Sequence, residues 1–122
     1  KIINSLKSNP KWNNQFNFID VPKKVSPSYM VFPIILNPSY KKKKVKFINY
    51  IESKGLETRP IISGSFTNQP SSKLFKLNPK NQSFKGAEEV QSLGFVIGLH
   101  TKRIDQKRVN FITKTLLAID DI

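Results

Sequence analysis

Two apolar runs constrain the fold of this chain more than any other feature. The run YMVFPIILN occupies residues 29–37, and the run FVIGLH occupies residues 95–100. Both runs are rich in β-branched and aromatic residues, which favours strands. Pro33 lies inside the first run and cannot donate to a sheet ladder, so we expect an edge position or a bulge there. The chain is therefore expected to contain a sheet.

Amphipathic segments with helical periodicity surround these runs. The last segment begins at Asp105, whose side chain suits an N-cap, and its apolar residues recur at spacings of three and four. The residues of this stripe are Val109, Ile112, Leu116 and Ile119. The expected helices cover residues 1–9, 37–56, 84–93 and the segment from Asp105 onward.

The helix expected over residues 37–56 has recognisable ends. Asn37 or Ser39 can cap its start, and Gly55 follows its last turn as a stop. The apolar spacing predicts which side chains face the core. These are Val45, Ile48 and Ile51, with Phe47 beside them.

The remaining segments connect these elements. Residues 10–28 are expected to form an ordered crossing segment or a linker, residues 56–63 a short strand, and residues 71–83 a loop. The expected anchors are Trp12, Phe16 and Phe18 in the first segment and Leu74, Phe75 and Leu77 in the loop. The alternation predicts the fold class α/β (α+β), a sandwich with a three- to four-stranded, mainly antiparallel or mixed sheet and helices packed on it.

The length and the absence of cysteine exclude several classes of protein. A chain of 122 residues fits one domain with a modest core. With no cysteine it can form no disulfide, use no catalytic thiol and build no cysteine-based zinc site. No run is long and apolar enough for a membrane span, and no signal peptide is recognisable. Because the chain begins at Lys1 within a helical pattern, we expect it to be a piece of a longer protein.

The net charge of +13 raises nucleic acid as a partner, because clustered cations bind phosphate with release of counterions. Against this, most of the 21 basic residues are lysine, and only Arg59, Arg103 and Arg108 are arginine. Arginine is the residue that phosphate and base recognition favour. The only dense cluster is the lysine run 41–44, and such runs are usually solvated. A small basic nucleic-acid-binding module therefore stays as the alternative reading.

The sequence shows no complete active site. His100, the only histidine, ends the second apolar run, where it could serve a site or be merely structural. The carboxylates have no metal-ligand spacing, and no nucleophile elbow or glycine-rich phosphate loop is present. Arg59 is held in an extended backbone by Pro60, so its guanidinium could bind phosphate or carboxylate as a fork. The alternative is an ion pair of Arg59 with Glu57 or Glu52.

The stretch GLETRPIISGSFTNQP, residues 55–70, resembles the small-domain motif of the DegT family of pyridoxal-phosphate-dependent sugar aminotransferases and dehydrases. The similarity is greatest to the branch of CDP-4-keto-6-deoxyglucose 3-dehydrase-like enzymes of lipopolysaccharide O-antigen biosynthesis. The stretch AEEVQSLGFVIGLH, residues 87–100, is similar to a second family segment, and the resemblance covers residues 29–122. The matching motif positions are Gly55, Glu57, Thr58, Arg59, Pro60, Gly64, Gln69 and Pro70.

The resemblance implies that residues 29–122 are the C-terminal small domain and residues 1–28 the end of a connecting helix plus a crossing segment. The implied substrate-binding residues are Arg59, Ser65, Gln69 and His100. Pyridoxal phosphate and every catalytic residue would belong to a large domain outside this chain, so this piece alone would be catalytically inactive. The parent would be a cytoplasmic homodimer that acts on a nucleotide-linked sugar, without a membrane or nucleic acid as partner.

Three positions depart from the pattern of that branch. Ser65 replaces an asparagine, Asn68 replaces an arginine, and Leu99 replaces an asparagine before the histidine. The departures leave the sugar, the amino donor and the choice between amino transfer and dehydration open. A third reading, a dimerisation domain without substrate contact, is also open at this point.

Overall fold

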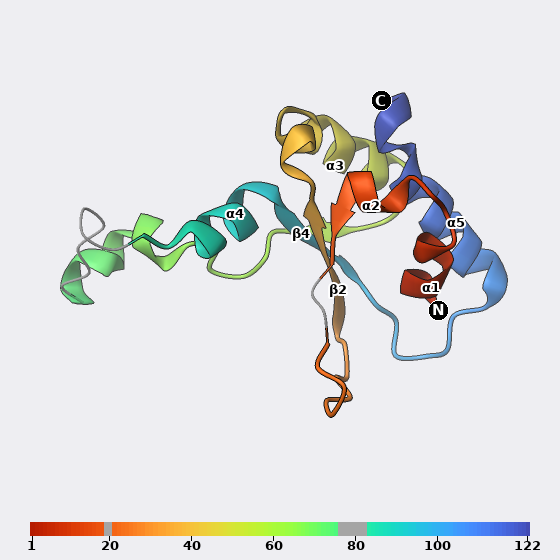
Figure 1. Cartoon of the computed structure of the whole chain (residues 1–122), viewed down its shortest axis with the longest axis horizontal. Helices are drawn as coiled ribbons and strands as arrows, with labels where there is room; N and C mark the ends of the chain where they lie inside the picture. Colours follow the sequence, from red (N-terminus) through yellow and green to blue (C-terminus); the bar gives the residue numbers. More distant parts are fainter. Residues whose placement is uncertain (19–20, 76–82) are drawn as a thin grey trace.

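Four short strands form one sheet at the centre of the molecule, with the order β1-β2-β4-β3 and antiparallel pairing throughout (Figure 1). The structure is a computed structural model, and it describes residues 1–18, 21–75 and 83–122. The strands are β1 (Phe16–Asn17), β2 (Val31–Leu36), β3 (Thr58–Arg59) and β4 (Gly94–Gly98). The expected α/β (α+β) fold is confirmed, and the sheet, expected to have three to four strands with mainly antiparallel or mixed pairing, has four antiparallel strands in the described residues.

Pro33 lies in β2, which is an inner strand of this sheet and not the edge strand that the sequence suggests. The backbone N–H of Leu99 donates to the carbonyl of Met30, and hydrogen-bonded pairs alternate along an antiparallel ladder. By that alternation Pro33 and Val96 form a non-hydrogen-bonded pair, so the nitrogen of Pro33 points away from β4. On that other side, the described part of β1 pairs only with Ile35 and Leu36. Proline is tolerated because no ladder bond is required of it.

The α-helices match the expected segments, with one addition. The α-helices are α1 (Ile2–Lys7), α2 (Trp12–Gln15), α3 (Lys44–Ser53), α4 (Lys85–Leu93) and α5 (Gln106–Leu117). The 3₁₀ segments are η1 (Pro38–Lys43), η2 (Phe66–Asn68), η3 (Pro70–Phe75) and η4 (Ala118–Asp121). Asp105 caps α5 by accepting from the N–H of Arg108, and Gly55 has the positive φ of +83° that a helix stop requires. The one-turn helix α2 and the two-residue strand β1 were not expected.

The core lies between the inner face of the sheet and the helices α1, α3 and α5 (Figure 1). Side chains alternate along β2, so that Phe32, Ile34 and Leu36 point into the core. The predicted stripe of the last helix is buried in full, with its last member, Ile119, in η4 directly after α5, which confirms it. From the N-terminal segment, Leu6 and Phe16 join the same core. Packing therefore crosses the boundary that the family resemblance places at residues 28 and 29.

The predicted stripe of α3 is partly wrong. Phe47 and Ile51 are fully buried, but Val45 is 71% exposed. The first six residues after Asn37 form a 3₁₀ helix, and the α-helix begins only at Lys44. In an α-helix Val45 lies about 200° around the axis from Phe47, at 100° per residue, so the two cannot share one face. Phe47, the larger of the two side chains, is the one buried in the core.

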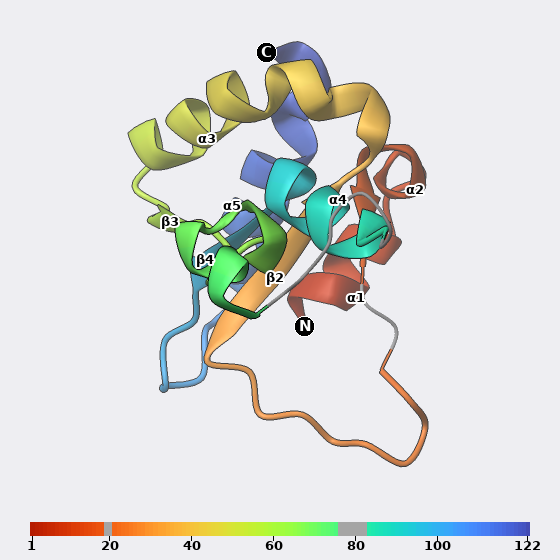
Figure 2. The same cartoon turned by 90° about the vertical axis from the view of Figure 1, so that its left-hand side faces the viewer.

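Residues 60–75 and α4 form an arm that extends from the sheet on the side away from α1 and α5 (Figure 1). The expectation that Leu74 and Phe75 pack onto the core is wrong, since they are 81% and 64% exposed. Phe75 packs instead edge-to-face against Phe66 of the same arm, with ring centroids 5.4 Å apart. Leu77 lies outside the described residues. Figure 2 shows α3 and the C-terminus at one end of the molecule and residues 21–30 at the other.

The aromatic anchors of the crossing segment are confirmed. Phe16 is 2% exposed, and Trp12 stacks on Phe18 with ring centroids 5.3 Å apart. Phe18 in turn lies against Phe32 of β2 at 5.5 Å. This chain of rings fixes the N-terminal segment against the sheet.

Candidate functional site

Arg59 lies on the edge strand β3, opposite Val96 of β4, and Pro60 directs the chain away from the sheet after it. Its guanidinium forms an ion pair with the carboxylate of Glu57. Both side chains are about 70% exposed, at 73% and 70%. An ion pair in such contact with water is weak. The guanidinium can therefore exchange Glu57 for another anion at little cost.

A tight turn follows Arg59 and Pro60. Ser63 has a φ of +69° and Gly64 a φ of +53°, so two consecutive residues adopt the left-handed conformation. For serine this conformation is strained, whereas glycine adopts it freely. The N–H of Gly64 donates to the carbonyl of Ile61 at 3.1 Å and closes the turn. The turn brings the next residues back toward α4.

Gln91 of α4 holds the segment after this turn. Its Oε1 accepts from the N–H of Ser65 at 2.7 Å and from Nδ2 of Asn68 at 3.1 Å. A Cβ on Gly64 would lie 3.0 Å from this oxygen and would also have to adopt the positive φ of +53°, and both favour glycine there. The sequence analysis missed Gln91, because one glutamine on the polar face of a helix carries no distinguishing signal.

Arg59 and Gln69 line one open groove of about 840 Å³ on the outer face of the sheet, here called the Arg59 groove. Nε2 of Gln69 donates to the carbonyl of Ser63 at 3.2 Å, which fixes the amide at the rim. Among the described lining residues Arg59 is the only charged one. The complete described lining is Met30, Val31, Pro33, Arg59, Pro60, Ile61, Ile62, Ser63, Gly64, Gln69, Gln91 and Val96. The groove thus combines apolar lining with one cation and the side-chain amides of Gln69 and Gln91.

The other two predicted substrate-binding residues lie elsewhere. Ser65 is fully buried, and its Oγ is hydrogen-bonded to Oγ1 of Thr67 at 2.7 Å, so it stabilises the loop behind the groove. His100 lies in the segment after β4, and its Nδ1 accepts from the N–H of Lys102 at 3.0 Å. It lines a different groove, together with residues of α1. The structure therefore groups Arg59 with Gln69 and separates Ser65 and His100 from them.

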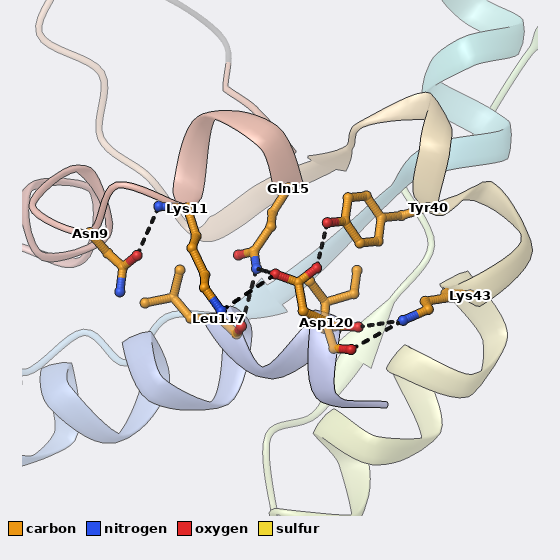
Figure 3. Close-up of polar contacts among 8 residues, drawn as sticks. Asn9, Lys11, Gln15, Tyr40, Lys43, Leu117 and Asp120 are labelled. Carbon is orange, nitrogen blue, oxygen red and sulfur yellow. Dashed lines mark hydrogen bonds and ion pairs between the residues drawn. The ribbon is translucent and has the colours of Figure 1, made fainter.

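A cluster around Asp120 connects several polar side chains outside these grooves (Figure 3). Oδ1 of Asp120 accepts from the hydroxyl of Tyr40 at 2.5 Å, and Oδ2 accepts from Nε2 of Gln15 at 2.7 Å. The hydrogen bond from Tyr40 holds the pKa of Asp120 below its usual value. The same bond raises the pKa of Tyr40 to about 12. The cluster joins η4 to α2 and η1, which is a structural role.

The lysine run 41–44 divides into two pairs. Nζ of Lys43 donates to the carbonyl of Ile119 at 3.2 Å, and Nζ of Lys44 donates to the carbonyl of Gln91 at 3.1 Å. These cations cap the ends of η4 and α4, and burial lowers the pKa of Lys44. Lys41 and Lys42 are exposed. The free cationic surface of the run is thus smaller than the sequence suggests.

The described residues contain no group of three or more acidic, histidine or cysteine side chains that could hold a metal ion. Within the same residues, every helix is too short or too polar to traverse a lipid bilayer.

Comparison of the chain with family models, with curated proteins and with solved structures finds no match. The similarity of residues 55–70 and 87–100 to the DegT family therefore stays a prediction from the sequence motif.

Proposed function

We propose that this chain is the small domain of a DegT-type, pyridoxal-phosphate-dependent enzyme that acts on a nucleotide-linked sugar. The observation that carries the proposal is the Arg59 groove. Arg59 and Gln69, two polar residues of the motif that resembles the family, are ten positions apart and line the same depression. Contact with one substrate requires that both residues lie at one site. Packing does not require it, because both side chains are exposed.

The chemistry of the groove fits a sugar with a charged substituent. A guanidinium fork binds phosphate or carboxylate oxygens through two parallel hydrogen bonds, and the amide of Gln69 can serve hydroxyls as donor and acceptor. The apolar side chains of Met30 and Ile62 beside them would exclude water from the bound ligand. Their high exposure, 79% and 86%, is otherwise unfavourable.

The cofactor would be held outside this chain. None of the described residues that line the Arg59 groove is a lysine, so the groove offers no amine for a Schiff base. Pyridoxal phosphate, when bound by a large domain, supplies the electron sink for chemistry next to the reacting carbon. The part of the present residues would be to bind and orient the sugar, to close one side of the cleft and to support a homodimer. Amino transfer and dehydration remain alternatives, and we place the parent enzyme in the cytoplasm, with lipopolysaccharide biosynthesis as its context.

The test is the substitution Arg59→Ala in the full-length enzyme. We expect KM for the nucleotide sugar to rise about tenfold or more, since a charge-assisted bidentate contact is lost. Arg59→Lys should restore only part of the loss, because an ammonium ion cannot form the fork. Lys46→Ala, an exposed cation on α3, is the control for net charge.

The opposite outcome is equally informative. If Arg59→Ala changes neither KM nor kcat, the chain makes no substrate contact at this groove. The reading as a dimerisation domain would then replace the proposal.

A further inference from the structure

The groove that contains His100 is a second candidate site. It has a volume of about 770 Å³, within the range of small-molecule sites. Here it is called the His100 groove, and its described lining is Lys1, Ile2, Ile3, Asn4, Tyr29, Phe32, Leu99, His100, Lys102, Arg103 and Ile104. It is formed by α1, the start of β2 and the segment that joins β4 to α5. These segments lie far apart in the sequence, and the fold brings them together.

The His100 groove and the Arg59 groove lie on opposite faces of β2. Phe32 lines the first, whereas its neighbours Val31 and Pro33 line the second. Successive side chains of a strand point to opposite faces of the sheet. The two grooves share no described lining residue, so they can be tested separately.

The rim of the His100 groove carries charge of one sign. Its charged lining side chains are Lys1, Lys102 and Arg103, beside the ionisable His100 and Tyr29, and no described lining residue is a carboxylate. Nζ of Lys1 donates to the carbonyl of Ile104 at 3.5 Å, which leaves Lys102 and Arg103 as the candidate anion contacts. The nearest acidic residue along the chain, Asp105, accepts from the N–H of Arg108 at 2.7 Å and is engaged as the cap of α5. Like charges that share one rim raise the local potential and attract anions.

The ring of His100 has a defined hydrogen-bonding direction. Its Nδ1 accepts from the N–H of Lys102, so the neutral ring carries its proton on Nε2. Nε2 is therefore a donor, as are the ammonium group of Lys102 and the guanidinium of Arg103. The same lining includes apolar side chains, among them Phe32 at 5% exposure and Ile2 at 7%. Tyr29, which is 43% exposed, adds an accessible aromatic face.

We propose that the His100 groove binds a small organic anion with an apolar body. The anionic group, a phosphate, sulfonate or carboxylate, contacts Lys102 and Arg103 at the rim, and the apolar body lies on Phe32, Leu99 and Tyr29. Charge complementarity selects the anion, and the apolar lining selects against bare inorganic ions, which gain nothing from it.

The probe is 8-anilinonaphthalene-1-sulfonate, an aromatic anion whose fluorescence reports transfer to an apolar surface. We expect saturable binding that weakens as the salt concentration rises. The double substitution Lys102→Ala with Arg103→Ala should weaken binding about tenfold, as expected for the loss of two partly solvated charge contacts. Unchanged far-UV circular dichroism and thermal unfolding verify that the variant is folded.

Two controls separate this site from general electrostatics and from the Arg59 groove. The double substitution Lys41→Ala with Lys42→Ala removes the same charge elsewhere and should leave the affinity unchanged. Arg59→Ala should also leave it unchanged, so that failure of the proposed function does not decide this inference. The uncharged analogue N-phenyl-1-naphthylamine should bind at least tenfold more weakly than the sulfonate.

Competition identifies the kind of anion. Displacement of the probe by phenyl phosphate points to an aromatic phosphate, and displacement by octanoate points to an aliphatic carboxylate. The proposal is overturned if neither competitor displaces the probe, if the uncharged analogue binds equally well, or if the two double variants weaken binding by the same factor.

Discussion

At the scale of single residues, the hydroxyl of Tyr40 and the carboxylate of Asp120 form a contact that pH measurements can resolve. Tyr40→Phe removes the donor, and we expect unfolding to become easier by about 1 kcal/mol, typical of one hydrogen bond. Urea unfolding followed by circular dichroism measures this. Tyr29→Phe, at an exposed position, is the matched control and should change stability by less than about 0.5 kcal/mol.

The pH dependence of this contact has a defined sign. The pKa of Asp120 is lower in the folded chain, so its contribution is present above the usual value of 3.8 and is lost as pH falls below it. The pKa of Tyr40 is raised to about 12, so that contribution is present below 10 and is lost as pH rises from 10 toward 12. Tyr40→Phe should flatten both limbs. An alkaline absorbance titration should lose its highest-titrating tyrosine, and a curve identical to wild type would contradict the assignment.

The sequence motif predicted the conformation of Arg59 but not the burial of Ser65. Arg59 before Pro60 was predicted to be extended, and it lies in a strand as expected. The pairing with Glu57, considered as the alternative, is also present. The burial of Ser65 could not be read from the sequence, because it depends on Gln91, 26 residues later, accepting from its backbone.

At the helices, alanine substitution of two glycines separates the effect of backbone strain from that of helix propensity. Gly55→Ala meets no atom within 4 Å but must adopt a φ of +83°, so we expect a loss of about 1 kcal/mol. Gly86→Ala also meets no atom, lies in α4 with an ordinary φ, and should gain about 0.5 kcal/mol. Opposite shifts in the midpoint of thermal unfolding would verify both effects. Equal signs would contradict the assigned boundaries of α3 or α4.

Helices and strands were predictable where an apolar pattern repeats over several turns. They were not predictable where only a few residues determine the local structure. The stripe of α5 and η4 spans about three turns, and each member is buried. By contrast β1 has two residues, and its existence depends on pairing with Leu36 rather than on local preference. Val45 was misplaced because Val45 and Phe47 cannot share one face of an α-helix, and apolar spacing alone does not indicate which of the two the core accommodates.

At the scale of the whole molecule, the core includes the N-terminal segment. Leu6 is fully buried against α5, so Leu6→Ala should cost about 3 kcal/mol through lost burial and the remaining cavity. Ile62→Ala, at a position that is 86% exposed, removes a comparable side chain and should cost less than about 0.5 kcal/mol. Equilibrium unfolding in urea compares the two. A similar, small cost for both would mean that residues 1–18 do not belong to the folding unit.

The fold class was predictable because alternating apolar runs and amphipathic segments permit few layer arrangements. The strand order was not predictable, because β1 and β3 are too short for their sequences to indicate which strands they pair with. The same applies to the two grooves, which depend on which face of β2 each neighbouring segment reaches.

Pro33 also affects how readily β2 can pair with a strand of another molecule. Along an antiparallel strand, a residue whose N–H points outward offers a donor to any further strand. Pro33 has no N–H, so β2 offers no donor on its outer side at this residue, and a strand from another molecule would gain less by pairing there. The proline thus makes the addition of a foreign strand to β2 less favourable.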